Sequence, residues 1–278
     1  MQLRADSLGL AGHVTTILRD LVHERLGLFY EPIHFDQLAD RVAPLVVARG
    51  LGSFMDYYYL LKYSDDAEEW GRLMDALAIQ ETYFWREIDQ LRAIVDHVVP
   101  KLTDELRGRP LRIWSVPCAT GEEPLTLAML LDEAGLLDQV TLVASDISAR
   151  ALAQAQNGIY RRRSLRSLPS GVVGRWLEGD ENGMRVAPRL VSAIAWHRVN
   201  LIDDRECSEL GAFDIIICRN VRIYFRDQTI EKLIDRLWQQ LTPEGQLLVG
   251  ASESLLRFKV AFACEEQGGS FFYRKLPQ

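Results

Sequence analysis

The sequence lacks the features that mark secreted, metal-binding and membrane-spanning proteins. Its 278 residues include only four cysteines, none of them in a C-x-x-C pair or at metal-ligand spacing from a histidine. These cysteines, which we expect to be free thiols, are Cys118, Cys207, Cys218 and Cys264. No apolar run approaches the roughly 20 residues that span a bilayer, and residues 1–10 lack the apolar core of a signal peptide. We therefore expect a cytoplasmic protein without a metal ion.

A surplus of basic charge is missing as well. The chain has 32 Lys and Arg against 39 Asp and Glu, which gives a formal net charge of −7. A protein that wraps nucleic acid needs clustered cations to neutralise the phosphates. The composition therefore disfavours a polynucleotide substrate.

Two hydrophobic patterns divide the chain. Over residues 1–78 the apolar residues recur at helical spacing with short breaks, which predicts a helical domain. Residues 79–110 are expected to form a linker and a connecting helix. From residue 111 to 278, short apolar runs alternate with helical patterns, which is typical of an α/β fold with a mostly parallel, doubly wound sheet. An irregular stretch at about 161–198 indicates a small insertion, and residues 270–275 are a candidate edge strand.

Residues 111–116 and 140–145 are the first two predicted strands of this sheet, and acidic residues follow each of them, where ligands of doubly wound sheets bind. Thr-Gly-Glu-Glu-Pro at 120–124 begins a helix with two carboxylates, which disfavours a bound phosphate. The G-x-G-x-x-G dinucleotide fingerprint is absent. Asp146 ends the second strand, where a carboxylate can bind ribose hydroxyls, although an Asp there is as often a helix cap. Together these features favour S-adenosylmethionine (SAM) as the cofactor.

Several segments resemble, in order and spacing, a CheR-type chemoreceptor glutamate methyltransferase. The most specific are Thr-Gly-Glu-Glu-Pro at 120–124 and Cys-Arg-Asn-Val-Arg-Ile-Tyr-Phe at 218–225, and the others are Thr82-Tyr-Phe-Trp-Arg86-Glu87, Ala144-Ser-Asp146-Ile and Asn200-Leu201. The resemblance covers essentially the whole chain. The Ser-Val-Pro-Cys segment at 115–118 is similar to that of members serving surface-sensing, Wsp-like chemosensory pathways.

The resemblance implies a fold, a reaction and a set of site residues. The fold is a Rossmann-like SAM-dependent methyltransferase domain with an N-terminal all-α domain and an inserted β-subdomain. The reaction is O-methylation of glutamate side chains on the cytoplasmic helical bundle of a chemoreceptor, with S-adenosylhomocysteine as product and no metal. Arg86 and Tyr224 resemble the residues that flank the transferred methyl group, and Asp146 the residue that binds the ribose. The implied cofactor contacts are Gln80, Thr82, Arg86, Glu123, Asp146, Asn200, Leu201, Arg219 and Asn220.

Methyl transfer from SAM to a glutamate needs few catalytic residues, and the resemblance implies only two, Arg86 and Tyr224. A glutamate carboxylate is already a nucleophile at neutral pH and a sulfonium methyl group is already activated, so catalysis depends mainly on positioning. Arg86 is suited to holding the acceptor carboxylate by a bidentate contact. Two other hypotheses stay open: a SAM-dependent methyltransferase with a different acceptor, and a catalytically silent receptor-binding module that retains SAM.

The receptor-docking features differ from those common in the family. Relatives often carry an arginine-rich second helix that docks the receptor, whereas this chain keeps little more than Arg41 and Arg49 there. The cluster Arg161-Arg-Arg163 with Arg166 is either a solvated charged face or a patch for an acidic receptor helix. The region 178–183 lacks the Gly-x-Gly insertion of relatives that tether to a receptor's C-terminal pentapeptide, so we expect independence from such a tether.

Overall fold

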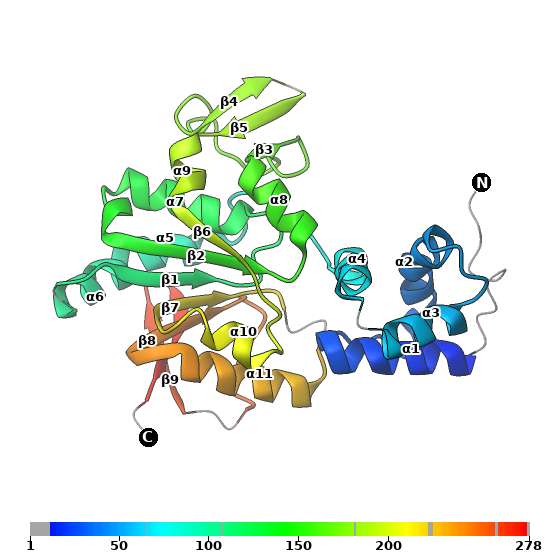
Figure 1. Cartoon of the computed structure of the whole chain (residues 1–278). Coiled ribbons are helices and arrows are strands. Elements are labelled where there is room, and N and C mark those ends of the chain that lie inside the picture. The colour runs from blue at the N-terminus through cyan, green and yellow to red at the C-terminus, as the bar shows by residue number, and fades with distance from the viewer. Residues whose placement is uncertain are drawn as a thin grey trace. The chain divides into compact units, whose positions relative to one another are not determined.

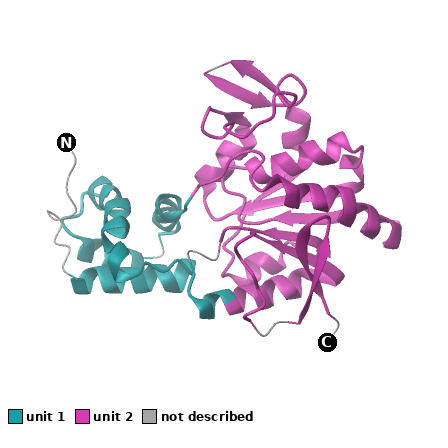
Figure 2. Cartoon of the chain, turned by 180° about the vertical axis from the view of Figure 1, so that it is seen from behind, with its two compact units in different colours: residues 1–79, 222–230 teal, residues 80–221, 231–278 magenta. Residues whose placement is uncertain are grey.

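The computed structural model describes residues 12–64, 66–106, 108–180, 182–221, 225–258 and 261–276. The chain forms two compact units (Figure 2). One consists of Met1–Ile79 and Arg222–Ile230, and the other of Gln80–Val221 and Glu231–Gln278. Tyr224, a predicted catalytic residue, lies outside the described residues.

The first unit is helical, as the apolar spacing predicted. Its helices are α1 (Gly12–Leu26), a 3₁₀ turn η2 (Pro32–His34), α2 (Phe35–Ala48), α3 (Phe54–Tyr63) and α4 (Ala67–Leu77). Side-chain caps start two of them: Ser53 accepts from the Asp56 N–H, and Asp66 accepts from the Glu69 N–H. Phe225 belongs to this unit because it forms an isolated antiparallel bridge with Leu28.

The segment expected to be a linker is part of the second unit. It contains α5 (Ile88–Ala93), a π-helical turn η3 (Ile94–Val98) and α6 (Val99–Glu105). Phe84, Ile94 and Val98 are fully buried in one hydrophobic core with Ile113 and Leu125. Because these apolar side chains pack into the core, the segment with α5, η3 and α6 belongs to the second unit and is not a linker.

The second unit contains a seven-stranded sheet in the order β6-β2-β1-β7-β8-β10-β9 (Figure 1). The strands are β1 (Leu111–Ser115), β2 (Val140–Asp146), β6 (Ile194–Arg198), β7 (Phe213–Cys218), β8 (Leu241–Val249), β9 (Phe262–Gln267) and β10 (Ser270–Lys275). The first five strands in this order pair in parallel, and β10 pairs antiparallel with β8 and β9. The predicted doubly wound, mostly parallel sheet is confirmed. The prediction of β10 as the edge strand was wrong, because β9 lies outside it.

Helices connect the parallel strands on both faces of this sheet. They are α7 (Glu122–Glu133) with the short η4 (Leu137–Gln139), α8 (Ala149–Asn157), α10 (Asp204–Ser208) and α11 (Asp227–Gln240). The chain steps from β1 to β2 in one direction and from β7 to β8 in the other. Because such crossovers are right-handed, α7 and α11 lie on opposite faces, and the switch point falls between β1 and β7. A ligand site is therefore expected at the carboxyl ends of these strands.

A small antiparallel sheet is inserted before β6 (Figure 1). It contains β3 (Ile159–Tyr160), β5 (Gly183–Val186) and β4 (Leu177–Asp180), in that order, and is followed by α9 (Pro188–Ser192). Trp176 donates from Nε1 to Asp132 on α7 at 2.7 Å, and Arg189 pairs with the same carboxylate. The predicted insertion at 161–198 overlaps this sheet, but Ile194–Arg198 forms β6, which pairs with β2 in the main sheet.

No helix in the described ranges is both long enough and apolar enough to span a bilayer.

Candidate active site

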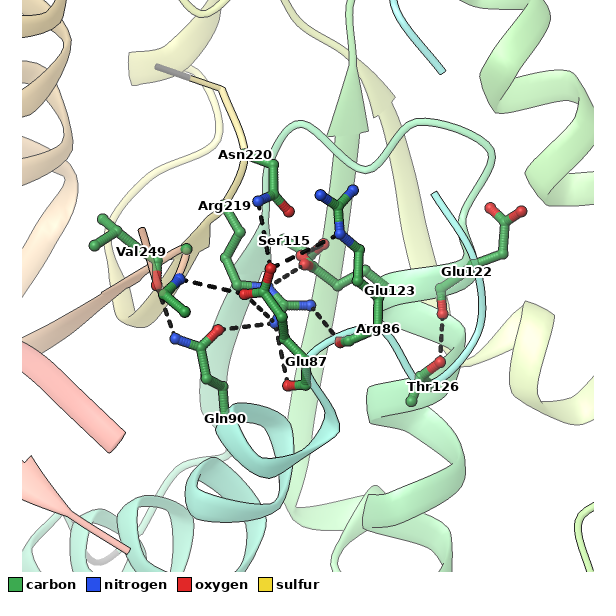
Figure 3. Close-up of polar contacts among 12 residues, drawn as sticks. Arg86, Glu87, Gln90, Ser115, Glu122, Glu123, Thr126, Arg219, Asn220 and Val249 are labelled. Carbon is green, nitrogen blue, oxygen red and sulfur yellow. Dashed lines mark hydrogen bonds and ion pairs between the residues drawn. The ribbon is translucent and has the colours of Figure 1, made fainter. Parts of the chain in front are cut away.

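Arg219, at the carboxyl end of β7, is the centre of a polar cluster (Figure 3). Its side chain is 1% exposed, and its Nε donates to Glu123 Oε2 at 2.7 Å. Nη1 donates to Gln90 Oε1 at 2.9 Å, and Nη2 donates to the carbonyl oxygen of Arg86 at 3.2 Å. One buried guanidinium thus joins the end of β7, the first turn of α7 and the segment before α5.

Glu87 lies on the other side of this guanidinium (Figure 3). Its Oε2 is 3.5 Å from Arg219 Nη1, and it also accepts from the N–H of Ala251 at 3.3 Å. Its Oε1 accepts from Asn220 Nδ2 at 3.4 Å and lies 3.8 Å from Arg86 Nε. Two anions, Glu87 and Glu123, therefore flank Arg219, and Glu87 links it to Arg86.

The predictions missed three members of the cluster: Glu87, Gln90 and Glu253. Glu253 is 3% exposed and accepts from the N–H groups of Asn220, at 2.6 Å, and Gly250, at 3.1 Å. A Cβ atom on Gly250 would come within 2.7 Å of Glu253 Oε2, so a larger residue there would displace this carboxylate from its present position. For Glu87, the one feature of the sequence that could have indicated a place in the site was its position directly after Arg86.

The two glutamates that begin α7 have different environments. Glu123 also accepts from Ser115 Oγ at 2.8 Å, and its side chain is 13% exposed. Glu122 is 1% exposed and accepts from Thr120 Oγ1 at 2.6 Å. Burial raises the pKa of Glu122, although hydrogen bonds from Thr120 and Ser164 oppose that shift. Glu123, the predicted cofactor contact, is therefore the carboxylate of the pair that joins the Arg219 cluster.

Asp146 fixes the two loops that follow β1 and β2. Its Oδ2 accepts from the Ala119 N–H at 2.8 Å, and its Oδ1 accepts from the Ser148 N–H at 2.9 Å. The N-cap of α8 is Ser148, whose side chain accepts from the N–H of Ala151, so the capping role left open by the sequence belongs to Ser148. Because a carboxylate oxygen has two lone pairs, one that accepts a backbone hydrogen bond can accept another from a hydroxyl group.

The other predicted contacts lie on segments that adjoin Asp146 or Arg219. Gln80 donates from Nε2 to Ser148 Oγ at 3.2 Å, beside the Asp146 turn. Thr82 is half-buried in the same segment. Arg86 donates from Nη1 to the Glu81 carbonyl at 2.7 Å, and its side chain is 26% exposed.

Asn200 and Leu201 reach this region through the β6 strand. The N–H of Val199 donates to the Asp146 carbonyl at 3.0 Å, which brings the end of β6 beside the end of β2. The N–H of Asn200 donates to Glu206 Oε2 at 2.6 Å, and Leu201 is 7% exposed. An amide and an apolar side chain at this place are suited to the edge and face of an adenine ring.

Backbone strain is concentrated around the same segments. Among the described non-glycine residues, five have positive φ, and four of these are Trp85 (65°), Glu87 (48°), Ala119 (46°) and Asn220 (58°). Trp85 also has a buried Nε1 without a hydrogen-bond partner. Such conformations persist only where surrounding contacts enforce them, and they are typical of binding and catalytic sites.

Family comparisons agree with this arrangement. The model described as "CheR methyltransferase, SAM binding domain" matches residues 80–269, and "CheR methyltransferase, all-alpha domain" matches residues 16–78. The chain belongs to the CheR methyltransferase family. The predicted resemblance and fold are thereby confirmed, and the reaction class is that of a SAM-dependent methyltransferase.

Individual members of the CheR family are similar along most of the chain. Chemotaxis protein methyltransferase 2 of Vibrio cholerae is 32% identical over 88% of this chain and 86% of its own length. The chemotaxis protein methyltransferase of Escherichia coli is 30% identical over 90% of this chain and 87% of its own. The probable biofilm formation methyltransferase WspC of Pseudomonas putida is 31% identical over 84% of this chain, which spans only 55% of that relative.

The donor set of the site fits the SAM that a CheR methyltransferase uses. SAM carries ribose hydroxyls, an ammonium group and a sulfonium, all of which favour carboxylate partners, together with one carboxylate of its own. Asp146 supplies a carboxylate at the end of β2, and Glu123 supplies one in the first turn of α7. The acidic first turn of α7 would oppose a phosphate ligand instead.

Proposed function

We propose that this protein methylates glutamate side chains on the cytoplasmic helical bundle of a chemoreceptor, using SAM. The observation that carries the proposal is the contrast between its two site arginines. Arg219 is enclosed by protein partners and 1% exposed, whereas Arg86, which Glu87 links to it, is 26% exposed. A partly exposed guanidinium next to the SAM-binding residues is suited to receive an anionic acceptor.

The residues of the site position the reactants. When bound, SAM would supply an activated methyl group for transfer to an oxygen of the acceptor carboxylate, with S-adenosylhomocysteine as the leaving group. Asp146 holds the ribose hydroxyls, and Glu123 offers negative charge to the cationic part of the cofactor. Arg86 orients the acceptor carboxylate, but too tight a contact would stabilise the ground state as well. Tyr224 remains the second catalytic candidate.

Arg219 is a positioning residue in this account. All three of its guanidinium nitrogens donate to protein oxygens, and these contacts fix Glu123, Gln90 and the Arg86 carbonyl. We infer that it acts on SAM through Glu123. Gln80, Thr82, Asn200, Leu201 and Asn220 complete the proposed cofactor contacts. The names of two relatives, which refer to chemotaxis and to biofilm formation, support a signalling pathway of this kind for the activity. A cytoplasmic location is part of the proposal.

Incubation with methyl-labelled SAM and purified receptor cytoplasmic fragments tests the proposal. The expected result is label on the receptor fragment, released as methanol by mild base because it is present as a methyl ester. Transfer only to a small molecule or to nucleic acid would contradict the acceptor class. SAM binding without transfer to any acceptor would favour a silent binding module.

A further inference from the structure

Four exposed arginines lie in one short segment of the second unit, just after β3. They are Arg161, Arg162, Arg163 and Arg166. The segment is wound into turns, with Ser164 N–H donating to the Arg161 carbonyl at 2.9 Å. Leu165 and Leu168 pack against the hydrophobic core, so their side chains anchor the segment while the arginines remain exposed.

A backbone hydrogen bond and a ring contact link this segment to the stretch of chain that carries Arg86. The N–H of Phe84 donates to the Ser164 carbonyl at 2.9 Å. The Cζ atom of Arg166 lies 3.7 Å from the centroid of the Tyr83 ring, and that of Arg86 lies 5.9 Å from the same centroid. One aromatic ring therefore contacts a guanidinium from the exposed cluster and the guanidinium proposed to receive the acceptor.

The arginines of α2, by contrast, are used inside the first unit. Arg41 donates from Nη1 to the Leu77 carbonyl at 2.9 Å, at the end of α4. Arg49 donates from Nε to Glu69 Oε2 at 2.6 Å and also pairs with Asp66. Both side chains therefore hold α4, and the charge of Arg49 is also paired with Asp66 and Glu69.

Arg166 alone of the exposed cluster has a hydrogen bond of this kind among the described residues, because its Nη1 donates to the Arg163 carbonyl at 2.9 Å. Within the described parts of the chain, the guanidiniums of Arg161, Arg162 and Arg163 have no carboxylate at ion-pair distance. The charge of Arg166 is partly offset by the buried Glu122: burial raises the pKa of Glu122, and attraction to Arg166 opposes that rise. The surface made by these residues is thus strongly cationic in a protein whose net charge is −7.

An acceptor segment that presents several glutamates is anionic, so a cationic surface would steer and orient it. We propose that Arg161, Arg162 and Arg163 dock the glutamate-bearing helix of the acceptor, which places one of its glutamates at Arg86. This inference rests on the proposed function. Because exposed ion pairs are individually weak and screened by salt, docking depends on the summed charge of the cluster.

The test is the steady-state kinetics of the full chain on a receptor cytoplasmic fragment, comparing wild type with Arg162→Glu/Arg163→Glu. The expected result is an increase in KM for the fragment of about tenfold or more at low salt, with kcat at saturation within about twofold of wild type. The dissociation constant for S-adenosylhomocysteine, measured by calorimetry, should stay unchanged. Raising the ionic strength should increase KM for wild type and affect the variant much less.

Two further variants separate charge from structure. Arg162→Lys/Arg163→Lys retains the charge and should keep KM near that of wild type. Lys101→Glu/Lys232→Glu makes the same change in net charge at exposed positions of α6 and α11 and should also leave KM nearly unchanged. Equal KM values for wild type and Arg162→Glu/Arg163→Glu would overturn the inference, as would an equal increase in Lys101→Glu/Lys232→Glu. Failure of wild type to methylate the fragment would instead overturn the proposed function.

Discussion

Arg219 and Glu123 form a hydrogen-bonded ion pair of 2.7 Å between the end of β7 and the first turn of α7. The pair spans the switch point of the sheet, where ligands of doubly wound folds bind. Because the Arg219 side chain is 1% exposed, water screens this pair little, and the orientation of Glu123 depends on it. The geometry of the proposed cofactor site is therefore set by contacts between elements that are distant in sequence.

Arg219→Lys should weaken binding of S-adenosylhomocysteine roughly tenfold or more, which corresponds to about 1.4 kcal/mol. A lysine ammonium keeps the charge but cannot reproduce the fork that contacts Glu123, Gln90 and the Arg86 carbonyl together. Calorimetric titration measures the effect.

Arg109→Lys is the matched control for this substitution. Arg109 forms a two-pronged ion pair with Asp214, with both distances 2.7 Å, at the opposite end of β7. Its replacement should lower stability without changing the affinity for S-adenosylhomocysteine. Equal affinities for wild type and Arg219→Lys would show that the fork does not orient Glu123 for binding.

Asp146→Asn should also weaken binding of S-adenosylhomocysteine, by roughly tenfold. The substitution replaces one acceptor oxygen by an NH₂ group, which faces the backbone N–H groups of Ala119 or Ser148 and cannot accept from ribose hydroxyls. Asp138→Asn, at an exposed position before β2, provides the control. Unchanged affinity in Asp146→Asn would contradict the ribose assignment.

Arg86→Ala should reduce methyl transfer far more than cofactor binding. The side chain is proposed to orient the acceptor, so kcat should fall by about tenfold or more while the affinity for S-adenosylhomocysteine changes by less than about threefold. Tyr224→Phe should likewise lower kcat more than the affinity for S-adenosylhomocysteine if Tyr224 flanks the reacting groups. Arg92→Ala, at an exposed position on α5, should behave as wild type. A loss of affinity as large as the loss of kcat would assign Arg86 to cofactor binding alone.

Asp132→Asn should remove a contribution to the free energy of unfolding that is present at neutral pH and lost at acid pH. The hydrogen bond from Arg189, helped by Trp176, lowers the pKa of Asp132 to about 2. A carboxyl with a depressed folded-state pKa stabilises the protein above its unfolded pKa of about 3.9, and this stabilisation is lost as pH falls towards 2. Because Arg189 is 55% exposed, we expect only about 1 kcal/mol at neutral pH.

Urea unfolding of wild type and Asp132→Asn from pH 7 to pH 2.5 checks this expectation. The difference in unfolding free energy should be constant above about pH 5 and shrink below about pH 4. A difference that does not change with pH would contradict an ionic role for Asp132 in anchoring the small sheet.

Deletion of a receptor's C-terminal pentapeptide should leave KM for that receptor unchanged. The β4 and β5 strands are only four residues long each, and the sequence between them lacks the Gly-x-Gly insertion that the family resemblance associates with such a tether. Kinetics on full-length and shortened fragments give the measurement. A marked increase in KM for the shortened fragment would show that the small sheet takes the tether after all.

Local patterns in the sequence were sufficient to predict the fold and the family. The Phe213–Cys218 run is buried throughout, as expected for a central parallel strand, and the acidic turn at 122–123 begins α7. The β9 strand was missed because Phe-Ala-Cys-Glu-Glu-Gln has charged residues on a half-exposed edge and shows no clear apolar run.

Contacts between distant residues were not predictable in the same way. Glu87 meets Arg219, which lies 132 residues later in the chain, and no local pattern encodes that pairing. Likewise, sequence alone does not distinguish the arginines that hold α4, Arg41 and Arg49, from the exposed Arg161 to Arg163. The sequence left the Arg161–Arg166 cluster with two interpretations, a solvated face or a patch for an acidic receptor helix, and the structure added its exposure and its hydrogen bond to the segment that carries Arg86.

Peptide mapping by mass spectrometry of a receptor cytoplasmic fragment, after reaction with SAM and this protein, tests the central claim most directly. The account predicts methyl esters on glutamate residues of the helical bundle, absent when those glutamates are replaced by alanine and strongly reduced with Arg86→Ala. Methyl groups found only on other residue types, or an unmodified fragment under conditions in which SAM is bound, would contradict it.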